Sequence, residues 1–110
     1  MQSKPGKFEV KESKSINIPL GMAFLLFSDA NMRRRWMKRI DLKVTNAVEN
    51  KTLRILWPDG SIVLVSFHAK ARNKTQVTAH QTELPTAKAA EKQRSFWIEH
   101  LDLLKKTVEI

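Results

Sequence analysis

The stretch that decides the fold closes the chain: AAEKQRSFWIEHLDLLKKTVEI, residues 89–110. Thr86 lies just before it and is a good helix N-cap, so the segment predicts a long terminal helix. Positions at alternating spacings of three and four form one helical stripe. The stripe consists of Ala87, Ala90, Arg94, Trp97, Leu101, Leu104 and Val108.

This spacing would also suit the seam of a coiled coil. Two observations favour packing within the chain instead. Arg94 occupies a seam position, and the residues before the helix predict an antiparallel sheet with an uncovered apolar face. Because a sheet needs a cover and an amphipathic helix needs a floor, we expect Trp97 and Leu101 to lie across that sheet.

Residues 42–84 alternate between apolar and polar side chains and predict four consecutive strands joined by short turns. WPDGS, residues 57–61, is a strong turn signal, because Pro58 and Gly60 suit their turn positions. Ile62 and Leu64 point away from the face that we expect to be buried. That face carries Val63, Val65, Phe67, Val77 and Ala79.

The first part of the chain predicts a half-exposed strand over residues 7–18, which Pro19 ends. Pro19 also suits the start of a helix. Residues 20–27 are apolar almost all round, so this helix is expected to be packed on two sides. Asp29 is a good N-cap for a second short helix over residues 30–37.

The totals fit one domain over residues 1–110, with residues 1–6 expected to be disordered. There is no cysteine, which excludes disulfides and thiolate chemistry. The apolar run at residues 22–27 is far too short to cross a bilayer. The polar N-terminus has no signal-peptide pattern, so we expect a cytoplasmic protein that does not bind membranes.

The chain is strongly basic, with a net charge of +9. Six basic residues and one acidic residue lie between Met32 and Lys43. Such a cluster can neutralise phosphates in a sequence-independent way, or it can simply be a solvated surface. The basic surface that we single out consists of Arg33, Arg34, Arg35, Lys38 and Arg39.

Three stretches, in this order, resemble a known fold: INIPLGMAFLLFSDANMRRRW (residues 16–36), WPDGSIVLVSFHAKARNKTQVTAHQTEL (residues 57–84) and AAEKQRSFWIEHLDLLKK (residues 89–106). They resemble the entry segment, the late hairpin and the closing helix of the SRPBCC superfamily, also called START-like, helix-grip or birch-pollen-allergen-like. Within it, the chain is most similar to the activator-of-heat-shock-protein-90-ATPase homologue-like family. The Arg35–Trp36 pair belongs to the first similarity.

The resemblance implies an α+β helix-grip domain. About five antiparallel strands would wrap round the long C-terminal helix, with two short helices after the first strand. The family usually has more strands after the first helices than the four expected here, so this chain looks like a shortened version. In the parent fold the sheet and the long helix enclose an apolar cavity.

We therefore expect a non-enzymatic binding domain that holds a small apolar or amphipathic ligand between sheet and helix, without a cofactor or metal. The small side chains of Ala87 and Ala90 leave room, so a cavity is expected there, with Arg94 at its edge. Arg94 would pair with a carboxylate such as Asp29 or with a bound anion, because a buried unpaired charge is costly. The expected lining is Phe24, Phe27, Trp36, Trp57, Phe67, Arg94, Trp97 and Leu101.

The three histidines suggest neither a metal site nor a catalytic base, because no carboxylates accompany them in a ligand pattern. We expect all three to be exposed or half-exposed. If His68 and His80 approached each other on neighbouring strands, they would form a pH-sensitive pair.

Two alternatives remain open. The chain could be a co-chaperone-like, stress-related protein-interaction module that uses residues 33–39 or the outward Ile62 and Leu64. It could also bind nucleic acid non-specifically through its basic residues. The expected assembly is a monomer or a weak homodimer.

Overall fold

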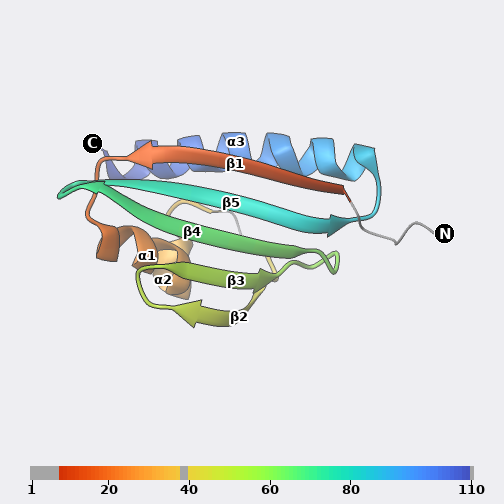
Figure 1. Cartoon of the computed structure of the whole chain (residues 1–110), viewed down its shortest axis with the longest axis horizontal. Helices are drawn as coiled ribbons and strands as arrows, with labels where there is room; N and C mark the ends of the chain where they lie inside the picture. The colour runs from red at the N-terminus through yellow and green to blue at the C-terminus, as the bar shows by residue number, and fades with distance from the viewer. Residues whose placement is uncertain (1–7, 38–39, 110) are drawn as a thin grey trace.

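A computed structural model describes residues 8–37 and 40–109 (Figure 1). The expected disorder of residues 1–6 lies outside this range. The elements are β1 (Phe8–Ile16), α1 (Leu20–Ser28), α2 (Ala30–Arg33), β2 (Lys43–Val48), β3 (Thr52–Leu56), β4 (Ile62–Ala71), β5 (Lys74–Leu84) and α3 (Ala87–Val108).

All five strands form one antiparallel sheet in the order β1-β5-β4-β3-β2. The four strands expected between residues 42 and 84 are confirmed as a meander, and β1 joins it beside β5. Gly60 closes the β3–β4 turn with a positive φ of 90°, which glycine adopts without strain. Asn50, with a φ of 61°, fills the equivalent place in the β2–β3 turn. The predicted α+β helix-grip architecture is confirmed.

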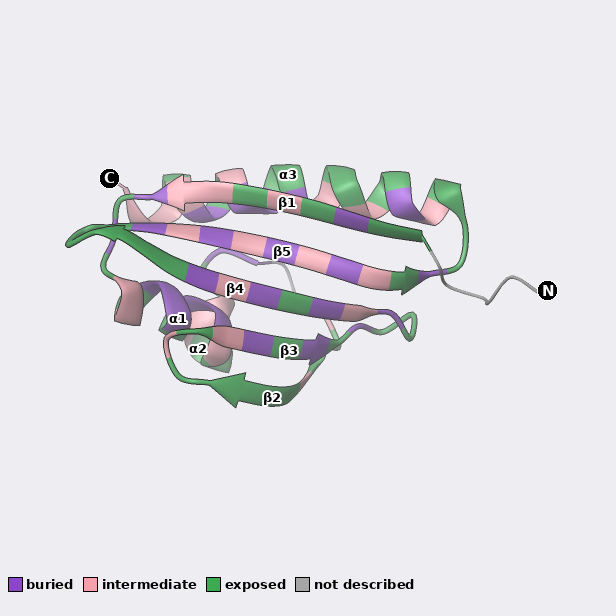
Figure 2. Ribbon diagram, in the orientation of Figure 1, coloured by how far each residue is buried: buried purple, intermediate pink, exposed green. Residues whose placement is uncertain are grey.

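One face of the sheet carries the core, and we call it the inner face (Figure 2). Direct partners across neighbouring strands share a face, so the register extends this surface over the whole sheet. α3 packs on β1 and β5, and α1 packs on β4 and β5, both behind the strands in Figure 1. The burial predicted for the residues of β4 and β5 on this face is confirmed, and two residues of β3 are buried with them. The inner face includes Leu53, Ile55, Val63, Val65, Phe67, Val77 and Ala79.

The stripe of α3 faces the sheet, which excludes a coiled-coil seam. Thr86 caps the helix as expected, with its side chain accepting a hydrogen bond from the backbone N–H of Ala89. Two stripe positions, Ala87 and Arg94, are exposed, and His100 is buried in their place. The prediction of an exposed His100 is wrong, because its i+3 spacing from Trp97 puts it beside the stripe.

The helix α1 packs on one side against β4 and β5 and on another against α2 and Trp36, as predicted. Its buried residues are Ala23, Phe24, Leu26 and Phe27. Met22 and Leu25, by contrast, are 43% and 48% exposed. Apolar composition alone could not reveal which residues of this helix stay exposed.

The helix α2 is shorter than predicted, ending at Arg33 instead of continuing to residue 37. Asp29 caps it as expected, because its carboxylate accepts hydrogen bonds from the backbone N–H groups of Asn31 and Met32. The chain then turns so that Trp36 enters the core. There its Nε1–H donates to the carbonyl of Leu26 at 2.7 Å.

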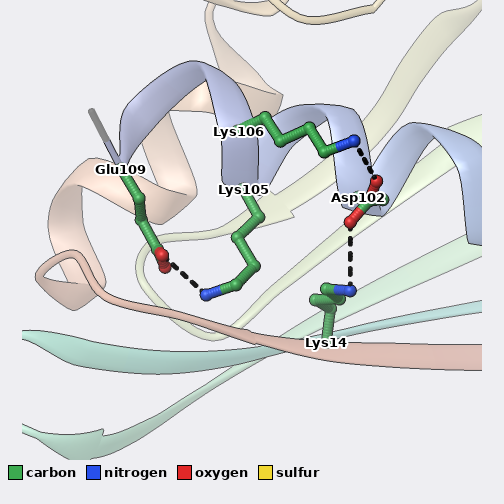
Figure 3. Close-up of polar contacts among 5 residues, drawn as sticks. All are labelled: Lys14, Asp102, Lys105, Lys106 and Glu109. Carbon is green, nitrogen blue, oxygen red and sulfur yellow. Dashed lines mark hydrogen bonds and ion pairs between the residues drawn. The ribbon is translucent and has the colours of Figure 1, made fainter.

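The C-terminal end of α3 is tied to β1 by polar contacts (Figure 3). Asp102 accepts from Lys14 on β1 at 3.3 Å and from Lys106 on α3 at 3.1 Å. Glu109 accepts from the backbone N–H of Asn17, just after β1, at 2.6 Å. These contacts place two carboxylates where the first strand and the last helix meet.

We predict that Trp97→Ala lowers the free energy of unfolding by about 3–5 kcal/mol, because Trp97 is completely buried. Urea denaturation followed by circular dichroism measures the change. Ile98→Ala is the control, since Ile98 is 54% exposed on the same helix and should change stability by less than about 0.5 kcal/mol. A loss below about 1 kcal/mol for Trp97→Ala would contradict inward packing.

A second prediction concerns acid. Hydrogen bonds from Lys106 and Lys14 lower the pKa of Asp102, and those from Lys105 and the Asn17 backbone lower the pKa of Glu109. A carboxyl whose pKa is lower in the folded state stabilises the fold above its unfolded pKa, about 4. This contribution is lost as the pH falls through the folded value.

We therefore expect the Asp102→Asn/Glu109→Gln variant to be less stable than the wild type at pH 7 and to approach it in strong acid. Urea midpoints measured from pH 7 to about pH 2 follow the difference. A difference that stays constant or grows on acidification would rule out this assignment.

Candidate functional site

The residues predicted to line a ligand site fall into two aromatic groups. We call Phe24, Phe27, Trp36 and Phe67 the α1 cluster. The ring centroids of Phe24 and Phe67 are 5.3 Å apart, those of Phe27 and Phe67 5.4 Å, and those of Phe27 and Trp36 4.7 Å. Phe27 has no exposed surface, whereas Phe24 and Phe67 keep 8% and 7% of theirs. Trp36 keeps 2%, so the α1 cluster touches solvent mainly at its Phe24–Phe67 end.

A hollow of about 360 Å³ lies between α1 and the β2–β3 turn. Phe24 belongs both to this hollow and to the α1 cluster. The opposite wall comes from the end of β2 and from the turn, which Asn50 shapes with its positive φ. The hollow is lined by Gly21, Phe24, Leu25, Ala47, Glu49 and Asn50.

The α3 cluster consists of Trp57, Phe96, Trp97 and His100. Trp57, just after β3, lies 5.4 Å from Phe96 and 5.5 Å from Trp97 between ring centroids. His100 stacks on Phe96 at 3.9 Å and donates its Nδ1–H to the Phe96 carbonyl at 2.9 Å. Leu101, another predicted lining residue, is buried on the same helix. This group joins the end of β3 to the middle of α3.

A buried polar chain that sequence reasoning missed runs from α3 to the β3–β4 turn. Trp97 Nε1–H donates to Gln81 Oε1 at 2.8 Å, and Gln81 Nε2–H donates to Ser61 Oγ at 2.8 Å. Ser61 Oγ donates in turn to Asp59 at 2.5 Å. Gln81 shares its parity on β5 with Val77, and this polar residue at an inward position was the available signal.

Arg94 pairs with a carboxylate, as expected, but the partner is Glu12 and not Asp29. The carboxylate of Asp29 caps α2. Arg94 instead lies 50% exposed at the border of the stripe, with its Nε 3.6 Å from Glu12 on β1. A second hollow, of about 460 Å³, lies beside it at the start of α3. This hollow is lined by Phe8, Glu9, Ala87, Lys88, Ala90, Glu91 and Arg94.

His68 and His80 do not approach each other, so the condition for a pH-sensitive pair is not met. His80 lies opposite Leu64, four residues along β4 from His68, or roughly 13 Å at the rise of a strand. His80 contacts Glu9 instead. Within residues 8–37 and 40–109, no group of three or more histidines and carboxylates could hold a metal ion.

The basic surface is partly used inside the fold. Arg33 donates to the carbonyl of Phe27 at 2.6 Å, and its burial lowers the pKa of the Arg33 guanidinium. Arg34 donates to the side chain of Asn31 at 2.7 Å, and Arg35 is exposed. Lys38 and Arg39 lie outside the described residues. The Arg33 side chain thus stabilises the end of α1 and is not part of a free basic surface.

The sheet, the long helix and the position of α1 define the helix-grip class of the SRPBCC superfamily. Residues 11–109 match the family model described as activator of Hsp90 ATPase homolog 1-like protein. The chain therefore belongs to this family. Among curated proteins, none matches the sequence. None of the described helices has the length and apolar character needed to span a membrane.

Solved structures share the fold at low sequence identity. Protein MLL2253 of Mesorhizobium loti is 14% identical with a TM-score of 0.81, over 93% of this chain and 97% of that one. The Aha1 dimer of Colwellia psychrerythraea is 15% identical with a TM-score of 0.79, over 94% and 97%. A conserved protein of unknown function, EF2215 of Enterococcus faecalis, is 15% identical with a TM-score of 0.78, over 94% and 75%.

The polar chain generates a third prediction. Gln81→Leu should lower the free energy of unfolding by about 1–3 kcal/mol, although leucine is more apolar, because Trp97 Nε1–H and Ser61 Oγ lose their partner. Denaturation in urea measures it. Gln76→Leu, at an outward position of the same strand, should stay within about 0.5 kcal/mol. Unchanged or increased stability of Gln81→Leu would contradict the role of the chain.

Proposed function

We propose that the protein is a binding domain, without catalytic chemistry of its own, for a small apolar or amphipathic molecule. One observation carries the proposal: Phe24 forms a wall of the hollow at α1 and is also a member of the aromatic α1 cluster. Its partial exposure makes it the side chain through which a ligand reaches the aromatic residues behind it.

The size and lining of the hollow support this assignment. Its volume of about 360 Å³ lies in the range of small-molecule sites. Phe24, Leu25 and Ala47 offer apolar contact on its walls, and Glu49 and Asn50 offer hydrogen-bonding groups at the turn. A molecule with an apolar body and one polar, donor-bearing end fits this distribution.

The α1 cluster extends the site inward. Phe24 meets Phe67 edge to face, and Phe27 and Trp36 lie behind them. Rotation of Phe24 would let an apolar group contact Phe67. In our proposal the other predicted lining residues do not contact the ligand, because they lie away from the hollow and the α1 cluster. They hold α3 on the sheet instead. These residues are Trp57, Arg94, Trp97 and Leu101.

A co-chaperone-like interaction module is the second candidate. The exposure of Arg35 and the description of the family as Hsp90 ATPase activator homologues favour it. The involvement of Arg33 in the end of α1 reduces the free basic surface, which weakens both this candidate and non-specific nucleic-acid binding. The similar protein of Colwellia psychrerythraea is a dimer. If this chain is an interaction module, we propose that a second copy of the chain is one of its partners.

The fourth prediction uses Gly21, whose position allows the hollow to be filled. A Cβ built there lies 3.9 Å from the side chain of Asn50, an ordinary contact, so a leucine side chain would project into the hollow. We expect the wild type to bind 1-aminoanthracene, a fluorescent apolar molecule with one amine donor, saturably, and Gly21→Leu to bind it at least about tenfold more weakly. Fluorescence titration measures both.

The substitution should not unfold the protein, because Gly21 lies in the first turn of α1 and leucine favours a helix more than glycine does, by at most about 1 kcal/mol. Met22→Leu is the matched control, since Met22 is exposed on the same helix and does not line the hollow. Equal binding by the wild type and Gly21→Leu, or no saturable binding by the wild type, would overturn the proposed site.

A further inference from the structure

The second face of the sheet, which we call the open face, has a composition of its own. Figure 1 shows α1 and α3 behind the sheet, and both pack on its inner face. The strand residues that alternate with those of the inner face therefore lie on the side away from both helices. The register aligns these side chains in rows across the sheet. This surface is separate from the hollow at α1.

An apolar patch lies near the β3–β4 turn. Leu56 and Ile62 are direct partners on β3 and β4, and Leu64 follows two residues after Ile62. Leu56 and Leu64 are each 38% exposed. Side chains at such positions lie about 5–7 Å apart, so these three residues form one contiguous surface.

Positive charges border the patch. Lys43 lies opposite Leu56, and Arg54 lies opposite Leu64. Lys11 continues the row of Leu64 beyond His80. Among the paired outward positions of the described strands there is no carboxylate. Glu9, which lies beside them, contacts His80.

We propose that the open face docks an extended, acidic polypeptide segment that presents both aliphatic side chains and Asp or Glu on one side, at every second position. The aliphatic groups would cover Leu56, Ile62 and Leu64, and the carboxylates would meet Lys43, Arg54 and Lys11. An extended segment suits this surface, because its side chains repeat at about the spacing of the rows. The proposal is independent of the small-molecule site.

Two other occupants fit less well. A second copy of the chain would bring two basic faces together within a pair of molecules that each carry +9, and like charges oppose such contact. A nucleic acid strand is usually held by aromatic side chains that stack on its bases. The paired outward positions of the described strands hold no Phe, Tyr or Trp.

A phage-display selection tests the proposal, with short random peptides as the library and the whole protein as the target. We expect enriched sequences to combine Asp or Glu with Leu, Ile or Val. A fluorescein-labelled enriched peptide should then lose at least about tenfold in affinity to the Arg54→Ser/Leu64→Ser variant, as measured by fluorescence anisotropy. Its binding should also weaken as salt increases, because salt screens the exposed charges.

The control variant Arg72→Ser/Leu103→Ser removes the same charge and an equally exposed leucine elsewhere, at the β4–β5 turn and on α3. It should keep the affinity within about twofold. Equal loss in both variants would show attraction by net charge alone and overturn the proposal. Enrichment of peptides without acidic residues would also overturn it, as would tighter binding of a single-stranded oligonucleotide that competes with the peptide.

Circular dichroism establishes that each variant is folded. Should Arg54→Ser/Leu64→Ser be unfolded, Lys43→Ser/Leu56→Ser removes a cation and an apolar residue from the same face. Retained peptide affinity in that variant would overturn the proposal, and a loss of at least about tenfold would support it.

Discussion

The structure depends on the burial of one large side chain that carries a hydrogen-bond donor. Trp97 lies completely inside the domain, between α3 and the sheet, and its indole N–H must have an acceptor there. Gln81 supplies the acceptor, and its own amide is satisfied by Ser61. The polar chain thus fixes the position of α3 along β5 more specifically than apolar contact could, because hydrogen bonds require a defined direction.

Periodic patterns in the sequence were sufficient to predict the five strands, the long helix and the inward direction of its stripe. The caps at Asp29 and Thr86 were also predictable, because a cap is local chemistry. The limits of the prediction appear where two distant segments meet. The pairing of Arg94 with Glu12, the burial of His100 and the polar chain at Gln81 all depend on which strand lies beside which helix residue. No local pattern carries that information.

The candidate site shows the same division. Aromatic composition predicted one group of lining residues, whereas the structure separates Phe24, Phe27, Trp36 and Phe67 from Trp57 and Trp97. The hollow at α1 needs the β2–β3 turn as its second wall, and that turn contributes no aromatic residue. The exposure of Leu25 was equally hidden, because an apolar helix looks the same in sequence whether one or both sides are covered. A ligand site of this kind is a property of the assembled fold.

The place of β1 in the sheet has a consequence for biosynthesis. β1 is the first element of the chain, yet its neighbours are β5 and α3, the last two elements. On the ribosome, the first strand therefore emerges long before anything exists for it to pair with. The strand contains lysines and is half-exposed. Charged residues of this kind keep an unpaired strand from associating with other chains before its partner is made. Pairing of β1 must therefore wait until β5 leaves the ribosomal exit tunnel, and the cover of both strands must wait for α3.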